Sequence, residues 1–112
     1  MLPRAMSSSE QRAESSGAPI AGQPRLLFFH ARASGRCRRV EGFLAQVLQR
    51  RANHATFAIE RIEVVEQPDV HERFGIDGLP TLIVIADRQL RGQIVDPAGC
   101  KAIEQFLAPW LR

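Results

Sequence analysis

The residues with the most distinctive chemistry are two cysteines, Cys37 and Cys100. In thiol–disulfide exchange one thiolate attacks the disulfide, and a second thiol resolves the mixed disulfide that forms. Three residues before Cys37 stands Ser34, whose hydroxyl has no redox chemistry. The segment Ser34-Gly35-Arg36-Cys37 therefore permits a single-thiol reaction at Cys37, but a dithiol cycle cannot run within it.

The surroundings of Cys37 favour a thiolate in one respect and oppose its use in another. The first turn of a predicted helix offers free N–H groups, and four arginines stand close by in the sequence: Arg32, Arg36, Arg38 and Arg39. However, Cys37 comes three residues before Val40, which belongs to the apolar stripe of that helix, so its sulfur is expected to point inward. We favour a small buried side chain over a reactive thiol.

Ser34 and Cys100 have simpler structural interpretations. Ser34 stands where a helix N-cap belongs, so its hydroxyl is expected to accept a hydrogen bond from the N–H of the second or third helical residue, the latter being Cys37. No base stands beside it in the sequence, which argues against a catalytic serine. Cys100 is expected to pack near the start of the last helix. A Cys37–Cys100 disulfide is not favoured, because it requires Cα atoms within about 7 Å.

The composition is typical of one globular domain. The chain has 112 residues, of which 45% are hydrophobic. Its longest apolar run, Leu82–Ala86, is far too short to cross a bilayer, and no apolar stretch follows Arg4, so we expect no secretory signal and a cytoplasmic location. The cysteines and histidines match no metal-ligand spacing, so we expect neither a metal nor a cofactor.

Charge is distributed unevenly along the chain, although the net charge is only +3. Seven arginines and one acid, Glu41, lie between Arg25 and Asn53, whereas six acids and two arginines lie between Glu60 and Asp77. We interpret the arginines as a solubilising surface in preference to a site for an anionic partner.

The hydrophobic periodicity predicts four strands and three helices after a flexible N-terminal tail, residues 1–24. The strands are expected over residues 26–29, 57–65, 81–86 and 89–95, the last at an edge with a tight turn at Asp87-Arg88 before it. The first helix follows Ser34 and ends near Ala52-Asn53, with Asn53 in the left-handed conformation. Pro68 and Pro97 are expected to open the other two helices.

This order of elements predicts the fold class. A strand–helix–strand unit followed by a hairpin and a helix gives an α/β domain over residues 25–112, with a mixed four-stranded sheet and helices on both faces.

Two local motifs and the closing helix resemble the thioredoxin family. The turn from Phe29 to Cys37 is similar to the family's Phe-Trp-Ala-x-Trp-Cys-Gly-Pro-Cys, and the segment Phe74-Gly75-Ile76-Asp77-Gly78-Leu79-Pro80-Thr81 is similar to Tyr-Gly-Ile-x-Gly-Ile-Pro-Thr. The helix that ends Ile103-Glu104-Gln105-Phe106-Leu107 completes the match. The resemblance implies a thioredoxin-like fold in which Pro80 is cis and faces the redox motif. It also implies that Leu79 offers its backbone to an extended peptide.

The chain departs from that family where the chemistry is carried out. Ser34 replaces the attacking cysteine, and Arg36 replaces the proline between the cysteines. Phe28 stands at the position of a buried aspartate that moves protons, and Asp96 stands where a glycine commonly lines the substrate site. His30 and Ala33 replace the two tryptophans around the site. The attacking cysteine, the proton-moving aspartate and the two flanking tryptophans are therefore all replaced in this chain.

These observations lead to three hypotheses about function. The first is a thioredoxin-like protein without dithiol oxidoreductase turnover that binds a peptide or protein partner through Gly35, Arg36, Leu79, Pro80 and Asp96. The second is a single-cysteine thiol–disulfide oxidoreductase or redox sensor that uses Cys37 with glutathione or an external thiol. The third, nucleic-acid binding through the arginines, ranks last because no exposed aromatic residues are interleaved with them.

Overall fold

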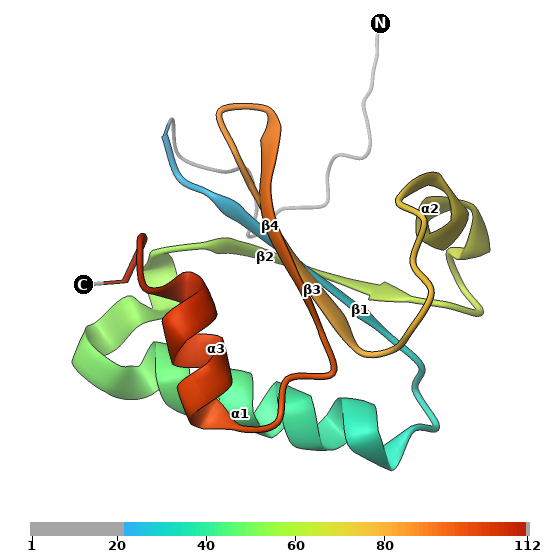
Figure 1. Cartoon of the computed structure of the whole chain (residues 1–112), viewed down its shortest axis with the longest axis horizontal. Coiled ribbons are helices and arrows are strands. Elements are labelled where there is room, and N and C mark those ends of the chain that lie inside the picture. Colours follow the sequence, from blue (N-terminus) through green and yellow to red (C-terminus); the bar gives the residue numbers. More distant parts are fainter. Residues whose placement is uncertain (1–21, 112) are drawn as a thin grey trace, which may run out of the picture.

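This computed structural model describes residues 22–111, in which two strand–helix units are followed by a hairpin of two strands and a last helix (Figure 1). The predicted tail, residues 1–24, lies outside the described residues except for residues 22–24. The strands are β1 (Arg25–His30), β2 (Ala58–Glu63), β3 (Thr81–Ala86) and β4 (Gln89–Val95). The helices are α1 (Gly35–Gln49), the 3₁₀-helix η2 (Arg50–Ala55), α2 (Pro68–Arg73) and α3 (Cys100–Leu107).

The four strands form one mixed sheet in the order β2-β1-β3-β4. Strand β1 runs parallel to β2 and antiparallel to β3, and β3 runs antiparallel to β4. The predicted mixed four-stranded sheet with helices on both faces is confirmed. The register sets Phe29 opposite Thr81, and Thr81 opposite Val95. Consequently the residues that follow β1, precede β3 and follow β4 all lie at the same end of the sheet.

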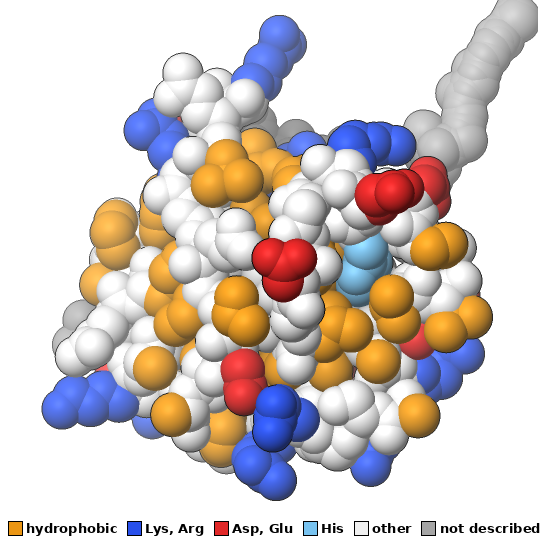
Figure 2. All heavy atoms as spheres, turned by 45° about the vertical axis from the view of Figure 1, so that its right-hand side comes forward, with side chains coloured by type: hydrophobic (Ala, Val, Ile, Leu, Met, Phe, Trp, Pro, Cys, Tyr) orange, Lys and Arg blue, Asp and Glu red, His pale blue; other side chains and the backbone are white. Residues whose placement is uncertain are grey.

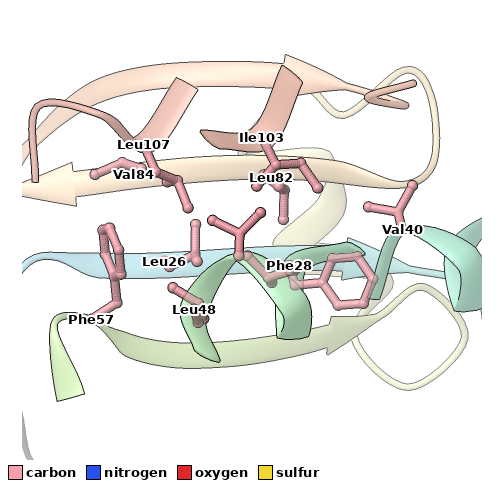
Figure 3. Close-up of a cluster of buried hydrophobic side chains, with 11 residues drawn as sticks. Leu26, Phe28, Val40, Leu48, Phe57, Leu82, Val84, Ile103 and Leu107 are labelled. Atoms are coloured by element: carbon pink, nitrogen blue, oxygen red, sulfur yellow. The ribbon is translucent and has the colours of Figure 1, made fainter. Parts of the chain in front are cut away.

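Helices cover both faces of this sheet, and a separate group of buried side chains lies under each face. On one face α1 and α3 pack side by side and enclose the larger group, in which Phe28 and Leu82 meet Val40 and Ile103 (Figures 1 and 3). On the other face the short helix α2 covers a smaller group, Leu27, Phe29, Ile62 and Ile83. Neighbouring residues of β1 alternate between the two groups, because successive side chains of a strand point to opposite faces.

The structure corrects two expectations about helix boundaries. The left-handed residue after α1 is Ala52, with φ 55°, whereas Asn53 is buried and donates a hydrogen bond to the Arg50 carbonyl (2.8 Å). Helix α3 begins at Cys100 and not at Pro97. The reason is that Gly99, its N-cap, has an extended backbone (φ 178°), which interrupts any helix begun at Pro97.

Strand β4 forms one edge of the sheet among the described residues. Asp87 and Arg88 both have positive φ (54° and 65°), as a two-residue hairpin turn of type I′ requires. A register shift follows, because Val84 pairs with Gly92 and Ile85 pairs with Leu90. Arg91 is therefore an extra residue on β4, which makes a β-bulge in the edge strand.

Candidate functional site

The site expected from the sequence is built from three chain segments at one end of the sheet. The turn after β1 leads into Ser34-Gly35-Arg36-Cys37, and Leu79 and Pro80 immediately precede β3. Asp96 follows β4, and its backbone N–H donates a 2.7 Å hydrogen bond to the Pro80 carbonyl. The Leu79–Pro80 peptide bond is cis. The antiparallel pairing of β1, β3 and β4 thus brings together residues that are far apart in the sequence.

Ser34 caps helix α1, as its residue type and position predict. Its backbone is extended (φ −85°, ψ 121°), and its hydroxyl accepts a 3.2 Å hydrogen bond from the N–H of Cys37. Because the first four N–H groups of a helix have no partner within the helix, this bond satisfies one of them. Ser34 therefore has a structural role at the position where the attacking thiol would stand.

The thiol of Cys37 points into the protein. The residue is only 2% exposed, and its sulfur accepts a hydrogen bond from the backbone N–H of Ala31 at 3.4 Å. Cys100 lies on α3, on the same face of the sheet, where its thiol donates to the Gln46 side-chain oxygen at 3.1 Å. Both cysteines are free, so no disulfide joins these helices.

A buried acid, Glu63, holds the turn that precedes the motif. It is 5% exposed, and its carboxylate accepts hydrogen bonds from the backbone N–H groups of Arg32 (2.9 Å), Val65 (2.8 Å) and Glu66 (3.0 Å). Glu63 belongs to none of the sequence motifs described above. The one available signal was an acid inside the apolar run Ile62-Glu63-Val64-Val65, where a charge must find partners if the strand is buried.

The three bonds to Glu63 make the stability of this turn depend on pH. The Arg32 N–H, followed by those of Glu66 and Val65, lowers the pKa of Glu63 below its ordinary value, although burial opposes the shift. A carboxyl group whose pKa is lower in the folded state stabilises the fold above its unfolded pKa of about 4.3. That contribution is lost as the pH falls through the folded pKa.

We expect Glu63→Gln to flatten the acid limb of the stability profile. Urea midpoints of the wild type should fall as the pH drops below about 4.3, and the Glu63→Gln variant should show a smaller part of that fall while being less stable at pH 7. Glu66→Gln is the matched control, because Glu66 is exposed in the same turn and pairs through its side chain with Arg32. An unchanged acid limb in Glu63→Gln would refute this role.

The backbone of Leu79 has no hydrogen-bond partner among the described residues. Its neighbours are tightly fixed: Thr81, fully buried, donates its hydroxyl to the Gly78 carbonyl at 2.7 Å, and a Cβ on Gly78 would stand 3.0 Å from the Val95 side chain. Val95 itself is 49% exposed. We call the Leu79 backbone, together with Gly78 and Val95, the peptide-binding edge, after the role that the resemblance implies for Leu79.

The arginines of the motif region differ in their partners. The guanidinium of Arg32 pairs with Glu66, and that of Arg38 donates to the Arg32 carbonyl at 3.3 Å. Arg36 forms an ion pair with Asp96, with 3.4 Å between Nε and Oδ2. For Arg39, no acidic partner is found within the described part of the chain. The sequence suggested a general arginine surface, whereas the structure joins Arg36 specifically to Asp96.

The core beneath the motif contains a phenyl ring where the resemblance implies an acid. Phe28 is 1% exposed and stacks on His30, with 5.1 Å between ring centroids and 13° between ring planes.

Among the described residues, no group of three His, Cys, Asp or Glu side chains is arranged to hold a metal ion. No described helix is long and apolar enough to cross a membrane.

Solved structures with this arrangement include several thioredoxins. A mutant thioredoxin from Halobacterium salinarum NRC-1 matches with a TM-score of 0.67 and 22% identity, over 81% of this chain and 77% of that one. Trxlp from Edwardsiella tarda EIB202 matches with a TM-score of 0.69 and 20% identity, over 81% and 84% of the two chains. At these identities the likeness establishes a thioredoxin-like fold.

The family is established by the sequence itself. The Thioredoxin family model matches residues 13–109. This chain therefore belongs to the thioredoxin family. No curated protein matches its sequence.

Proposed function

We propose that this thioredoxin-family chain binds an extended segment of a partner protein at the peptide-binding edge and does not turn over disulfides through a dithiol cycle. The observation that carries the proposal is the unpaired backbone of Leu79, within the described residues, at the end of the sheet where the Ser34 turn also lies. An extended segment can pair with such a backbone as an added strand, and this pairing needs no thiol.

Exposed apolar surface beside Leu79 supports the same proposal. Val95 is 49% exposed, because it points to the opposite face of β4 from its partly buried neighbour Ile94. The side of the molecule that carries α2 and the start of α1 displays several exposed hydrophobic side chains between acidic and basic ones (Figure 2). Apolar contacts of this kind add to the strength of backbone pairing, and the alternating side chains of the bound strand select the partner.

The thiol chemistry argues in the same direction. A dithiol cycle needs an exposed attacking thiolate and a resolving thiol. Here the hydroxyl of Ser34 caps α1, and the Cys37 thiol is 2% exposed. Both requirements fail here, so a dithiol cycle is disfavoured, whereas binding through the backbone is unaffected.

The binding proposal is tested by substituting Val95. Peptides selected from a phage-displayed random library against the wild type should lose at least about fivefold in affinity for Val95→Lys, since the charged side chain replaces an apolar contact worth about 1 kcal/mol or more. Fluorescence anisotropy gives the dissociation constants. Leu90→Lys is the matched control, because Leu90 is 54% exposed on the same strand. Failure to select any peptide, or equal losses for both variants, would contradict the proposal.

A second function, single-thiol exchange with glutathione, rests on one observation. The Cys37 sulfur already has a hydrogen-bond donor in place, the backbone N–H of Ala31 at 3.4 Å. In that reaction the Cys37 thiolate attacks oxidised glutathione, a protein–glutathione disulfide forms, and one glutathione thiolate leaves. The burial of Cys37 makes this the weaker of the two functions.

Thiol labelling separates the two functions. We expect a maleimide or oxidised glutathione to modify the half-buried Cys100 in the native protein and to leave Cys37 unmodified. If Cys37 reacts only after an opening that costs about 3 kcal/mol, its labelling is slowed about a hundredfold. Mass spectrometry of Cys37→Ser and Cys100→Ser assigns each signal. Rapid glutathionylation of Cys37 without denaturant would instead support single-thiol exchange.

A further inference from the structure

The Arg36–Asp96 ion pair connects the two segments that border the peptide-binding edge. Arg36 belongs to the first turn of α1, and Asp96 is bonded through its backbone N–H to the Pro80 carbonyl, next to Leu79. Nε of Arg36 and Oδ2 of Asp96 are 3.4 Å apart. A partner segment that pairs with Leu79 must therefore lie beside this link.

Asp96 places a carboxylate directly after β4. Its φ is 47°, in the left-handed region that glycine adopts freely and that aspartate and asparagine adopt more readily than most other residues. The carboxylate that the chain carries at this position forms its ion pair with Arg36.

The ion pair leaves Arg36 able to take another carboxylate. Its 3.4 Å separation is longer than the 2.7–2.9 Å of a strong charge-assisted hydrogen bond. The Arg36 side chain is 64% exposed, whereas that of Asp96 is 39% exposed, so the guanidinium is the more accessible half. Guanidinium groups bind carboxylates best in a two-pronged arrangement, which Arg36 does not make with Asp96.

We infer that the Arg36–Asp96 pair is an ionic latch across the peptide-binding edge, and that it selects partner segments carrying an acidic side chain. Such a side chain replaces Asp96 as the partner of Arg36 and so opens the latch. A segment without an acid must separate the pair and forms no new ion pair with Arg36 to compensate. This inference rests on the proposed peptide-binding function and specifies its partner.

Two substitutions distinguish the two halves of the latch. Asp96→Asn removes the competing charge and keeps a side chain that tolerates a positive φ. Arg36→Gln removes both the latch and the proposed receptor for the acid. The probes are an acidic peptide from the phage selection and its twin with glutamine in place of the acid, and fluorescence anisotropy measures both dissociation constants.

We expect the wild type to prefer the acidic peptide to its twin. Asp96→Asn should bind both peptides more tightly, by up to about fivefold, the most that an exposed ion pair contributes. Arg36→Gln should bind the twin more tightly and lose the preference for the acid. Arg50→Gln and Glu104→Gln are matched controls, because Arg50 and Glu104 also pair at 3.4 Å, and their pair joins the other end of α1 to α3.

The outcomes separate this inference from the binding function on which it rests. If the selected peptides are weakened by Val95→Lys but respond equally to the Arg36, Asp96 and control substitutions, the latch is refuted and peptide binding stands. A preference for the acid that survives in Arg36→Gln, or enrichment of lysine in place of acids, also refutes it. If no variant selects a peptide, both proposals fail together.

Discussion

Replacing Phe28 with alanine is expected to reduce the free energy of unfolding by about 3–5 kcal/mol. The side chain is 1% exposed and lies in the larger core, between the helices α1 and α3 and the sheet (Figure 3). It also stacks on His30, so the variant loses a ring contact in addition to apolar burial. Domains of this size have total stabilities of about 5–15 kcal/mol, so a large part of the stability depends on this one ring.

Chemical denaturation followed by circular dichroism measures this loss. Phe28→Leu should lose less stability than Phe28→Ala, because leucine leaves a smaller cavity, although the ring contact with His30 is lost in both variants. Val65→Ala is the surface control, since Val65 is 80% exposed and its truncation should change stability by about 0.5 kcal/mol or less. A loss below about 1 kcal/mol in Phe28→Ala, by the same scale, would mean that the ring does not fill the core as described.

The second large effect is expected from Ser34→Cys, which should introduce disulfide reductase turnover. The introduced thiol would stand at the N-cap of α1, where the free N–H groups and the helix dipole stabilise a thiolate. Its thiolate attacks an insulin disulfide and releases one insulin thiolate. Cys37 then attacks the mixed disulfide and releases the second, and dithiothreitol reduces the resulting Cys37 disulfide.

Insulin precipitation with dithiothreitol measures this gain. The wild type should stay at the background rate of dithiothreitol alone, whereas the rate with Ser34→Cys should rise in proportion to protein concentration. Adding Cys37→Ser to that variant should lower the turnover rate sharply, because only external dithiothreitol then remains to resolve the mixed disulfide. Loss of the serine cap should also lower stability by about 1 kcal/mol. Turnover by the wild type that disappears in Cys37→Ser would contradict the proposed function.

Periodic and local features of this chain were predictable from the sequence. The ranges of β3 and β4 match the expected strands, since an apolar β-branched run and a two-residue turn define them within a few residues. Ser34 was predicted as the cap of α1, because a cap depends on the serine and on the apolar stripe that follows it. Inward orientation of Cys37 followed from the same stripe.

Features set by contacts across the fold were not predictable in this way. The Arg36–Asp96 pair and the hydrogen bond from the Arg32 N–H to Glu63 join segments that only the sheet register brings together. The left-handed residue after α1 was assigned to Asn53 by its residue type, but tertiary contacts bury Asn53 and leave Ala52 in that conformation. Likewise Pro97 suits a helix start, although the extended Gly99 delays α3.

The bulge at Arg91 has a consequence for how this protein behaves at high concentration. An exposed edge strand is a template on which a second molecule can add a strand, and chains of such additions lead to aggregates. In β4 the extra residue disrupts the regular pattern of backbone groups, and that residue carries a charge held towards Asp87 at 3.3 Å. The bulge therefore protects the β4 edge against indiscriminate self-association, while the backbone of Leu79 stays available for pairing.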